Sequence, residues 1–199
     1  MRVLEVRGRA MQAACEETQG AMLSVMGLGQ PVLEEICAAA GVELANLNAA
    51  DQMVLSGKRE GILLAEAQAK GKGAKRTVVL NVAGAYHSSL MASAAVKLEQ
   101  TLAGIRISEP TMPVMSNVTG RPHENAEAIR HNMVRQVTNP VQWIACTECF
   151  RSSGIAEYVE FGPGKVLSGL VKRIDKESST HNIQDQLTLQ KTIEAIGLG

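Results

Sequence analysis

The chain has 199 residues, and 45% of them are hydrophobic, so it can bury a core as one domain or as one domain with a small subdomain. Lys plus Arg and Asp plus Glu both number 20, and aromatic residues make up 3%. This composition lacks the basic stripe and the aromatic platform of nucleic-acid-binding proteins. No apolar run approaches the ~20 residues that cross a bilayer, and the charged N-terminus does not resemble a signal peptide. We therefore expect a cytoplasmic protein, or one in an organelle whose targeting segment is absent here, with no membrane or nucleic-acid partner.

The first 83 residues alternate between helical and strand patterns. Residues 2–18 carry apolar side chains at three- and four-residue spacing, which predicts a helix that Gly20 ends. The next predicted elements are a strand at 21–26, a helix at 30–40, strands at 42–48 and 52–56, a helix at 58–70 and a strand at 75–82. The order β-α-β-β-α-β is that of a ferredoxin-like unit. We expect residues 19–83 to form this small subdomain.

The rest of the chain has an α/β pattern. We predict helices at 88–102, 125–136 and 141–152, and strands at 113–117 and 157–161. A further predicted helix follows the turn at 162–164 and ends at residue 174. The tail, residues 176–199, predicts only a short terminal helix. We expect residues 1–18 and 84–199 to form a partial parallel α/β large subdomain. Because two or three strands are too few for a stable parallel sheet, we expect that a segment before Met1 or a partner chain completes it.

Cys146 and Cys149 have C-x-x-C spacing on one predicted helix. A zinc or redox site of this kind needs a second ligand pair or a thioredoxin-like context, and the sequence has neither. We interpret these thiols as buried side chains and predict no metal.

Two residues of the pattern have side chains suited to catalysis or anion binding. His87 lies where a strand gives way to a helix, and its pKa suits a general base, although a structural role is common at such a place. Arg7 lies on the polar side of the first helix, where it is either solvated or able to bind a carboxylate through two hydrogen bonds.

Amide side chains gather on the predicted small subdomain. Asn46 and Asn48 alternate on one strand and so share a face, and Gln52 begins the next strand. They can bind a polar ligand or cap a turn. The glycine-rich turn at 160–169 fits neither nucleotide-binding motif, although its backbone amides can face a site from a helix N-terminus.

Five segments occur in an order that identifies a family. They are residues 5–12, residues 46–48 with 52–57, residues 86–91, residues 134–136 with 139–143, and residues 160–169. Together they closely resemble malonyl-CoA:acyl-carrier-protein transacylases, and the resemblance extends from residue 2 to about residue 174. It implies a hydrolase-like α/β subdomain with an inserted ferredoxin-like (βαββαβ) subdomain, which agrees with the pattern above.

The resemblance implies roles for individual residues. Arg7 would bind the free carboxylate of a malonyl group and thereby reject acetyl groups. His87 would be the general base, and the backbone carbonyl of Gln136 would orient it in place of the acid of a Ser-His-Asp triad.

The other matched residues would surround the substrate. Asn46, Asn48 and Gln52 would line the pocket and the boundary between subdomains. Tyr86 resembles the malonyl-type pattern rather than the methylmalonyl one.

The resemblance implies an acyltransferase of fatty acid biosynthesis. Malonyl would pass from malonyl-CoA, a coenzyme A thioester, through a serine ester to the phosphopantetheine thiol of acyl carrier protein. The reaction needs no cofactor, and the complete enzyme is expected to be a monomer.

The sequence departs from the family in one respect. No serine stands in a G-x-S-x-G frame, and the family's oxyanion segment is also missing. We therefore expect little or no activity from the chain as given. A fragment, a truncated gene and a separate N-terminal chain all remain open, as does the choice between fatty acid and polyketide synthesis.

Two other functions compete with the transacylase. One is a non-catalytic module that binds acyl carrier protein or malonyl, with a basic stretch facing the acidic carrier. That basic stretch, which can equally be a solvated turn, comprises Lys70, Lys72, Lys75 and Arg76. The other is a hydrolase or acyltransferase of the same fold that uses another acyl group.

Overall fold

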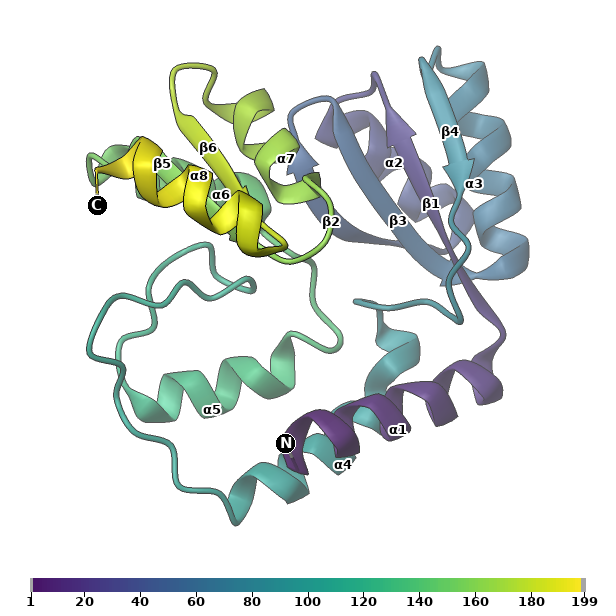
Figure 1. Cartoon of the computed structure of the whole chain (residues 1–199). Helices are drawn as coiled ribbons and strands as arrows, with labels where there is room; N and C mark the ends of the chain where they lie inside the picture. Colours follow the sequence, from purple (N-terminus) through teal and green to yellow (C-terminus); the bar gives the residue numbers. More distant parts are fainter. Residues whose placement is uncertain (1, 198–199) are drawn as a thin grey trace.

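The computed structural model describes residues 2–197 as two separate sheets with helices packed around them (Figure 1). One sheet has four strands, and the other has two parallel strands close to the C-terminus. A pair of long helices, α1 (Arg2–Thr18) and α4 (Ala92–Ala103), packs side by side below the larger sheet. The mixed α/β class predicted from the sequence is confirmed.

The four-stranded sheet has the strand order β2-β3-β1-β4, and all its pairs are antiparallel. Its strands and their crossover helices are β1 (Gly20–Met26), α2 (Gln30–Ala40), β2 (Glu43–Ala49), β3 (Gln52–Lys58), α3 (Arg59–Gly71) and β4 (Arg76–Val79). This order is that of the predicted ferredoxin-like unit. Strand β4 is shorter than predicted, although Leu80 still donates a backbone hydrogen bond to Met22, 2.9 Å long.

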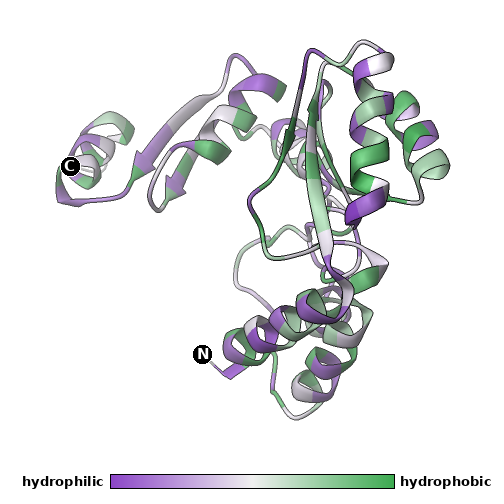
Figure 2. Ribbon diagram, turned by 90° about the vertical axis from the view of Figure 1, so that its right-hand side faces the viewer, coloured by the Kyte–Doolittle hydropathy of each residue, from purple (hydrophilic) through white to green (hydrophobic). Residues whose placement is uncertain are grey.

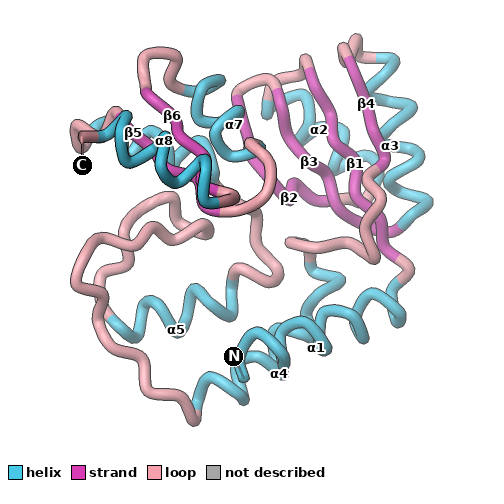
Figure 3. The backbone as a smooth tube through the Cα atoms, viewed as in Figure 1, coloured by secondary structure: helices cyan, strands magenta, loops and turns pink. Residues whose placement is uncertain are grey.

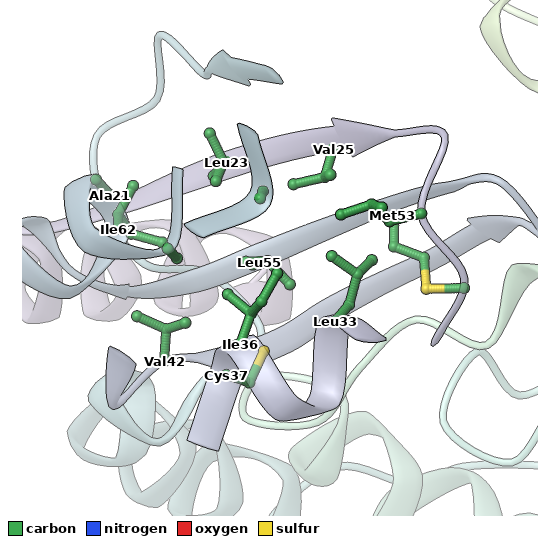
Figure 4. Packing of buried hydrophobic residues seen from close by; sticks show 13 residues of the cluster. Ala21, Leu23, Val25, Leu33, Ile36, Cys37, Val42, Met53, Leu55 and Ile62 are labelled. Carbon is green, nitrogen blue, oxygen red and sulfur yellow. The ribbon is translucent and has the colours of Figure 1, made fainter. Parts of the chain in front are cut away.

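The main core lies between this sheet and helices α2 and α3 (Figure 4). Strand alternation turns Leu23 of β1 and Leu55 of β3 to this face, and both are fully buried. Leu33, Ile36 and Ile62 of the helices are fully buried against them. Each side chain of this size contributes about 1.5–3 kcal/mol on burial, so this unit has a substantial core of its own.

The opposite face of the sheet has a smaller apolar cluster of Met22, Ala45 and Val54. Leu80 and Tyr86, both in the segment that follows β4, pack against it. This face therefore contacts the part of the chain that holds Tyr86 and His87.

Helices α1 and α4 bury a second core, which includes Ala14 and Leu98. Both helices are amphipathic, with apolar and polar residues alternating along them (Figure 2). The segment before Tyr86 passes so close to α1 that a Cβ at Gly84 would lie 2.4 Å from the sulfur of Cys15. A glycine at position 84 thus allows the chain to cross α1 at contact distance.

The predicted strand at 113–117 is wrong. Within the described residues, Met115 pairs only with Pro122 in an isolated bridge. Pro113 and Pro122 have no N–H group, which prevents a regular ladder here. The neighbouring helices are the short 3-10 helix η1 (Ser89–Met91), α5 (Ala126–Arg135) and α6 (Trp143–Ser152).

The C-terminal unit contains the parallel pair β5 (Glu157–Phe161) and β6 (Ser179–Ile183), with α7 (Val166–Ile174) and α8 (Gln186–Ile196) around it (Figure 3). The sequence analysis missed β6 because its residues, Ser-Thr-His-Asn-Ile, are mostly polar. Among residues 2–197, no strand pairs with the second edge of β5. Phe161 at its end is 77% exposed.

Over residues 2–197, the structure contains no helix with the length and apolar character of a membrane span. The division of the chain into residues 1–18 plus 84–199 and residues 19–83 stays a prediction.

Candidate active site

A cavity of about 270 Å³ opens where α1, the four-stranded sheet and the segment after β4 meet. Its lining residues are Arg7, Met11, Met22, Asn46, Tyr86 and His87. Arg7 and Met11 are four residues apart on α1 and therefore share one face of that helix. The structure thus brings Arg7, Asn46, Tyr86 and His87, all named from the sequence, to one cavity.

His87 has an unusual backbone conformation. Its φ angle is +59°, in the left-handed region that non-glycine residues seldom adopt. Such a conformation costs about 1–3 kcal/mol and persists only where the surroundings hold it. Next to it, the hydroxyl of Ser88 donates a 2.7 Å hydrogen bond to the carbonyl of Ala85 and closes the turn. Strain of this kind is frequent at functional sites.

The imidazole of His87 is oriented by the backbone of Gln136. Its Nδ1 lies 2.8 Å from the Gln136 carbonyl oxygen. Because a carbonyl can only accept, Nδ1 carries the hydrogen and Nε2 keeps a free lone pair. Nε2 is therefore the atom that can take a proton.

The pKa of His87 lies below its usual value of 6.5, chiefly because burial disfavours the charged ring. Hydrogen bonds to the backbone of Gln136 and Asn139 oppose this effect, and the positive charge of Arg7 adds to it. The ring is therefore neutral at pH 7, which is the state that a general base needs.

Gln136 connects His87 with Arg7. While its backbone carbonyl accepts from His87, its side-chain Oε1 accepts from Arg7 Nη2 at 3.4 Å. Its Nε2 in turn donates to the carbonyl of Met133, 3.3 Å away. One residue, at the C-terminal end of α5, thus contacts both Arg7 and His87.

The segment that follows Gln136 is fixed to the edge of the large sheet. Leu47 donates a 2.9 Å backbone hydrogen bond to Val141, and Val141 donates a 2.8 Å bond to Ala45. These two bonds involve the residues directly before and after Asn46. The strand that carries Asn46 therefore also holds the segment that follows Gln136.

Of the remaining predicted site residues, Tyr86 lines the cavity, and Asn48 and Gln52 do not. Tyr86 lines the cavity, and burial raises the pKa of its hydroxyl. Asn48 is half-buried on β2 and does not line the cavity. Gln52 accepts a hydrogen bond from Arg173 of α7, so it lies where the sheet contacts the C-terminal unit.

The sequence analysis missed two lining residues, Met11 and Met22. The signal for Met11 was its position one turn after Arg7 on the same helix. The signal for Met22 was strand alternation, which turns it away from α2 and α3.

The cysteines show no sign of a metal or redox site. Cys15, Cys37, Cys146 and Cys149 are all free. Within residues 2–197, no group of three or more His, Cys, Asp or Glu side chains could hold a metal ion. Burial raises the pKa of Cys37 and of Cys146 to about 11 each, so both stay protonated and unreactive at neutral pH.

The basic stretch predicted as an alternative docking site is partly neutralised. Lys70 pairs with Glu66 at 2.9 Å, and Lys72 pairs with Glu35 at 2.8 Å. Two of its four cations therefore contact acids of the same subdomain.

Comparisons with known proteins identify relatives of this chain. The malonyl CoA-acyl carrier protein transacylase of Escherichia coli K12 is 42% identical over 178 residues, which is 87% of this chain and 58% of the relative. The same enzyme of Bacillus subtilis is 34% identical over 195 residues, or 96% of this chain and 62% of the relative. The chain is homologous to the C-terminal part of these transacylases. No protein-family model matches it.

Solved structures of other malonyl transacylases share the fold. The enzyme from Coxiella burnetii has a TM-score of 0.93 at 36% identity and is matched over 97% of this chain and 62% of its own. A malonyl-transacylase in complex with a type II PKS acyl-carrier protein has a TM-score of 0.94 at 37% identity, with 98% and 64% matched. The chain thus spans about three fifths of the transacylases, and almost all of its own structure is shared with them.

Proposed function

We propose that this chain forms the malonyl-binding and proton-transferring part of a malonyl-CoA:acyl-carrier-protein transacylase. The observation that carries the proposal is the convergence of Arg7 and His87 on one cavity, with Gln136 hydrogen-bonded to both. The homology to transacylases named for malonyl-CoA and acyl carrier protein supports the same reaction.

In this proposal Arg7 recognises the substrate. Its guanidinium pairs with the free carboxylate of the malonyl group, and hydrogen bonds between charged groups are about twice as strong as neutral ones. An acetyl group has no carboxylate and leaves Arg7 without this partner, so acetyl-CoA is rejected. Gln136 Oε1 holds the guanidinium in place until the carboxylate arrives. Asn46 lines the same cavity and can donate to the thioester carbonyl.

His87 moves the proton in both half-reactions. Nε2 takes the proton of a hydroxyl nucleophile as its oxygen bonds to the malonyl carbonyl, and it returns the proton to the departing coenzyme A sulfur. It then takes the proton of the phosphopantetheine thiol as that sulfur attacks the ester, and it returns this proton to the released hydroxyl. No electron is gained or lost in either step, so the proposed reaction uses no redox cofactor.

The nucleophile lies outside the 199 residues in this proposal, since no serine of the sequence stands in a G-x-S-x-G frame. The open edge of β5 and the exposed Phe161 offer a surface on which further parallel strands can pack. The acyl carrier protein and coenzyme A thioesters are the proposed partners, and the cytoplasm is the proposed location.

Calorimetric titration of the 199-residue chain with malonyl-CoA and with acetyl-CoA tests the proposal. We expect malonyl-CoA to bind more tightly, and we expect Arg7→Gln to remove the difference. Losing a hydrogen bond to a charged group costs about 1.5–3 kcal/mol, which corresponds to roughly 10–150-fold in affinity.

Arg9→Gln is the matched control, because Arg9 lies on the same helix and pairs with Glu5 in solvent. Equal affinity for the two thioesters in the unsubstituted chain, or a preference that survives Arg7→Gln, would disprove the assignment.

A further inference from the structure

We propose that Glu43 is a positioning residue for His87 and acts through Ser89. The inference rests on the proposed function, in which His87 is the general base. Glu43 begins β2 of the large sheet, whereas Ser89 follows His87 by two residues, so the contact joins the sheet to the loop that carries the base.

The contact between the two residues has several hydrogen bonds. The backbone N–H of Ser89 lies 3.0 Å from Oε1 and 3.2 Å from Oε2 of Glu43. The hydroxyl of Ser89 donates to Oε1 at 2.6 Å. Both oxygens of one carboxylate therefore hold a single residue, through its backbone and through its side chain. Hydrogen bonds to a charged acceptor are shorter and stronger than neutral ones.

Glu43 provides a cap that the local sequence does not. Ser88 stands at the N-cap position of η1, but its hydroxyl bonds to the Ala85 carbonyl and makes no cap hydrogen bond. The N–H groups that begin η1 and α4 therefore need an acceptor from elsewhere in the fold. A carboxylate suits this place because a helix N-terminus favours negative charge.

The cap bears directly on the strained backbone of His87. A left-handed φ angle on a non-glycine residue, as at His87, persists only where the surrounding structure holds it. The Ser88–Ala85 bond closes the turn across His87, and Glu43 fixes Ser89, two residues after His87. Without Glu43, the backbone can relax to an ordinary φ angle and carry the imidazole away from the Gln136 carbonyl.

The charge that acts on the His87 ring is that of Arg7 on α1, and the other contributions come from burial and from the backbone of Gln136 and Asn139. Glu43 therefore influences the ring through geometry. Its loss exposes the imidazole to water. Relief of burial, the largest cause of the lowered pKa, outweighs the lost hydrogen bond to Gln136 and brings the pKa of His87 back up toward 6.5.

The test is an NMR pH titration of the full 199-residue chain with labelled histidine. We expect Glu43→Ala to raise the pKa of His87 by about 0.5 units or more, within the ~1-unit spread that folded proteins show. Glu43→Gln retains an acceptor for the Ser89 N–H, and Ser89→Ala removes only the hydroxyl bond, so each should give a smaller rise. The ring signals of His123, His131 and His181 serve as internal references.

Glu35→Ala is the matched control, because Glu35 of α2 pairs with Lys72, the C-cap residue of α3, and its loss should leave His87 unchanged. An unchanged His87 titration in a folded Glu43→Ala chain overturns the proposal. Should that variant not fold, unchanged titrations in Glu43→Gln and Ser89→Ala overturn it. If the pKa of His87 depends on Glu43 but the chain shows no preference for malonyl-CoA, the transacylase assignment is disproved and the positioning role of Glu43 is not.

Discussion

The two sheets of this chain differ in how their apolar surfaces are covered. The four-stranded sheet has α2 and α3 against one face, and its central leucines, Leu23 and Leu55, are fully buried. The two-stranded sheet leaves Phe161 77% exposed and has an unpaired edge at β5 within the described residues. The first unit therefore contains its own core, whereas the second presents surface suited to a further packing partner. The candidate site lies on the side of the first unit.

The largest expected effect comes from replacing one leucine with alanine in each of the two units. Leu55→Ala removes a fully buried leucine and should lower the free energy of unfolding by about 2–5 kcal/mol. Leu167→Ala, at the start of α7, alters a side chain that is 43% exposed and should cost less than ~1 kcal/mol. Urea denaturation of both variants measures the difference. Equal costs would contradict the contrast between the two units.

A smaller effect is expected at the strained residue of the candidate site, which lies beside the first unit. His87→Asn can keep both the left-handed φ angle and a hydrogen bond to Gln136, whereas His87→Ala loses the hydrogen bond and adopts the left-handed φ angle only at a cost. The asparagine variant should therefore be more stable than the alanine variant by about 1–2 kcal/mol, as read from their urea midpoints. An alanine variant of equal stability would show that the backbone here is free to relax.

The smallest expected effect is a dependence of stability on pH. Because the pKa of His87 is lower in the folded chain than in the unfolded one, the unfolded chain binds more protons below pH 6.5. The free energy of unfolding should therefore fall as the pH drops from 6.5 toward the pKa of His87 in the folded chain. Above pH 6.5 the contribution of the neutral His87 ring to stability should be fully present. His87→Asn should make the slope shallower, with the lowered pKa of His123 still contributing. A slope that is the same in both chains would contradict the burial of His87.

Much of the fold was predictable because local patterns decide it. The predicted helix at 30–40 coincides with α2, where Pro31 stands in the first turn and Gly41 ends the helix at a φ angle of +64°. The predictions failed where tertiary contacts outweigh local preference. The polar strand β6 forms by pairing with β5, and the two prolines near Met115 prevent the strand that the apolar residues had suggested.

The sequence predicted individual residues of the site but not the contacts between them. The sequence motifs placed Arg7, His87 and Gln136 far apart in the chain, and only the fold shows that Gln136 contacts the other two. No local pattern indicates the bond from Glu43 to Ser89, because it joins residues 46 positions apart. The left-handed φ angle of His87 is likewise sustained by tertiary contacts, and the sequence around it does not favour it.

The central claim is that Arg7 and His87 face one malonyl group in one cavity. The most direct measurement follows the NMR signal of the His87 ring while malonyl-CoA is added to the chain, and then repeats the addition with acetyl-CoA and with Arg7→Gln. We expect a saturable shift of the His87 signal with malonyl-CoA, and a much weaker response in the other two experiments. A His87 signal that stays in place while malonyl-CoA binds, or that responds equally to acetyl-CoA, would contradict the account.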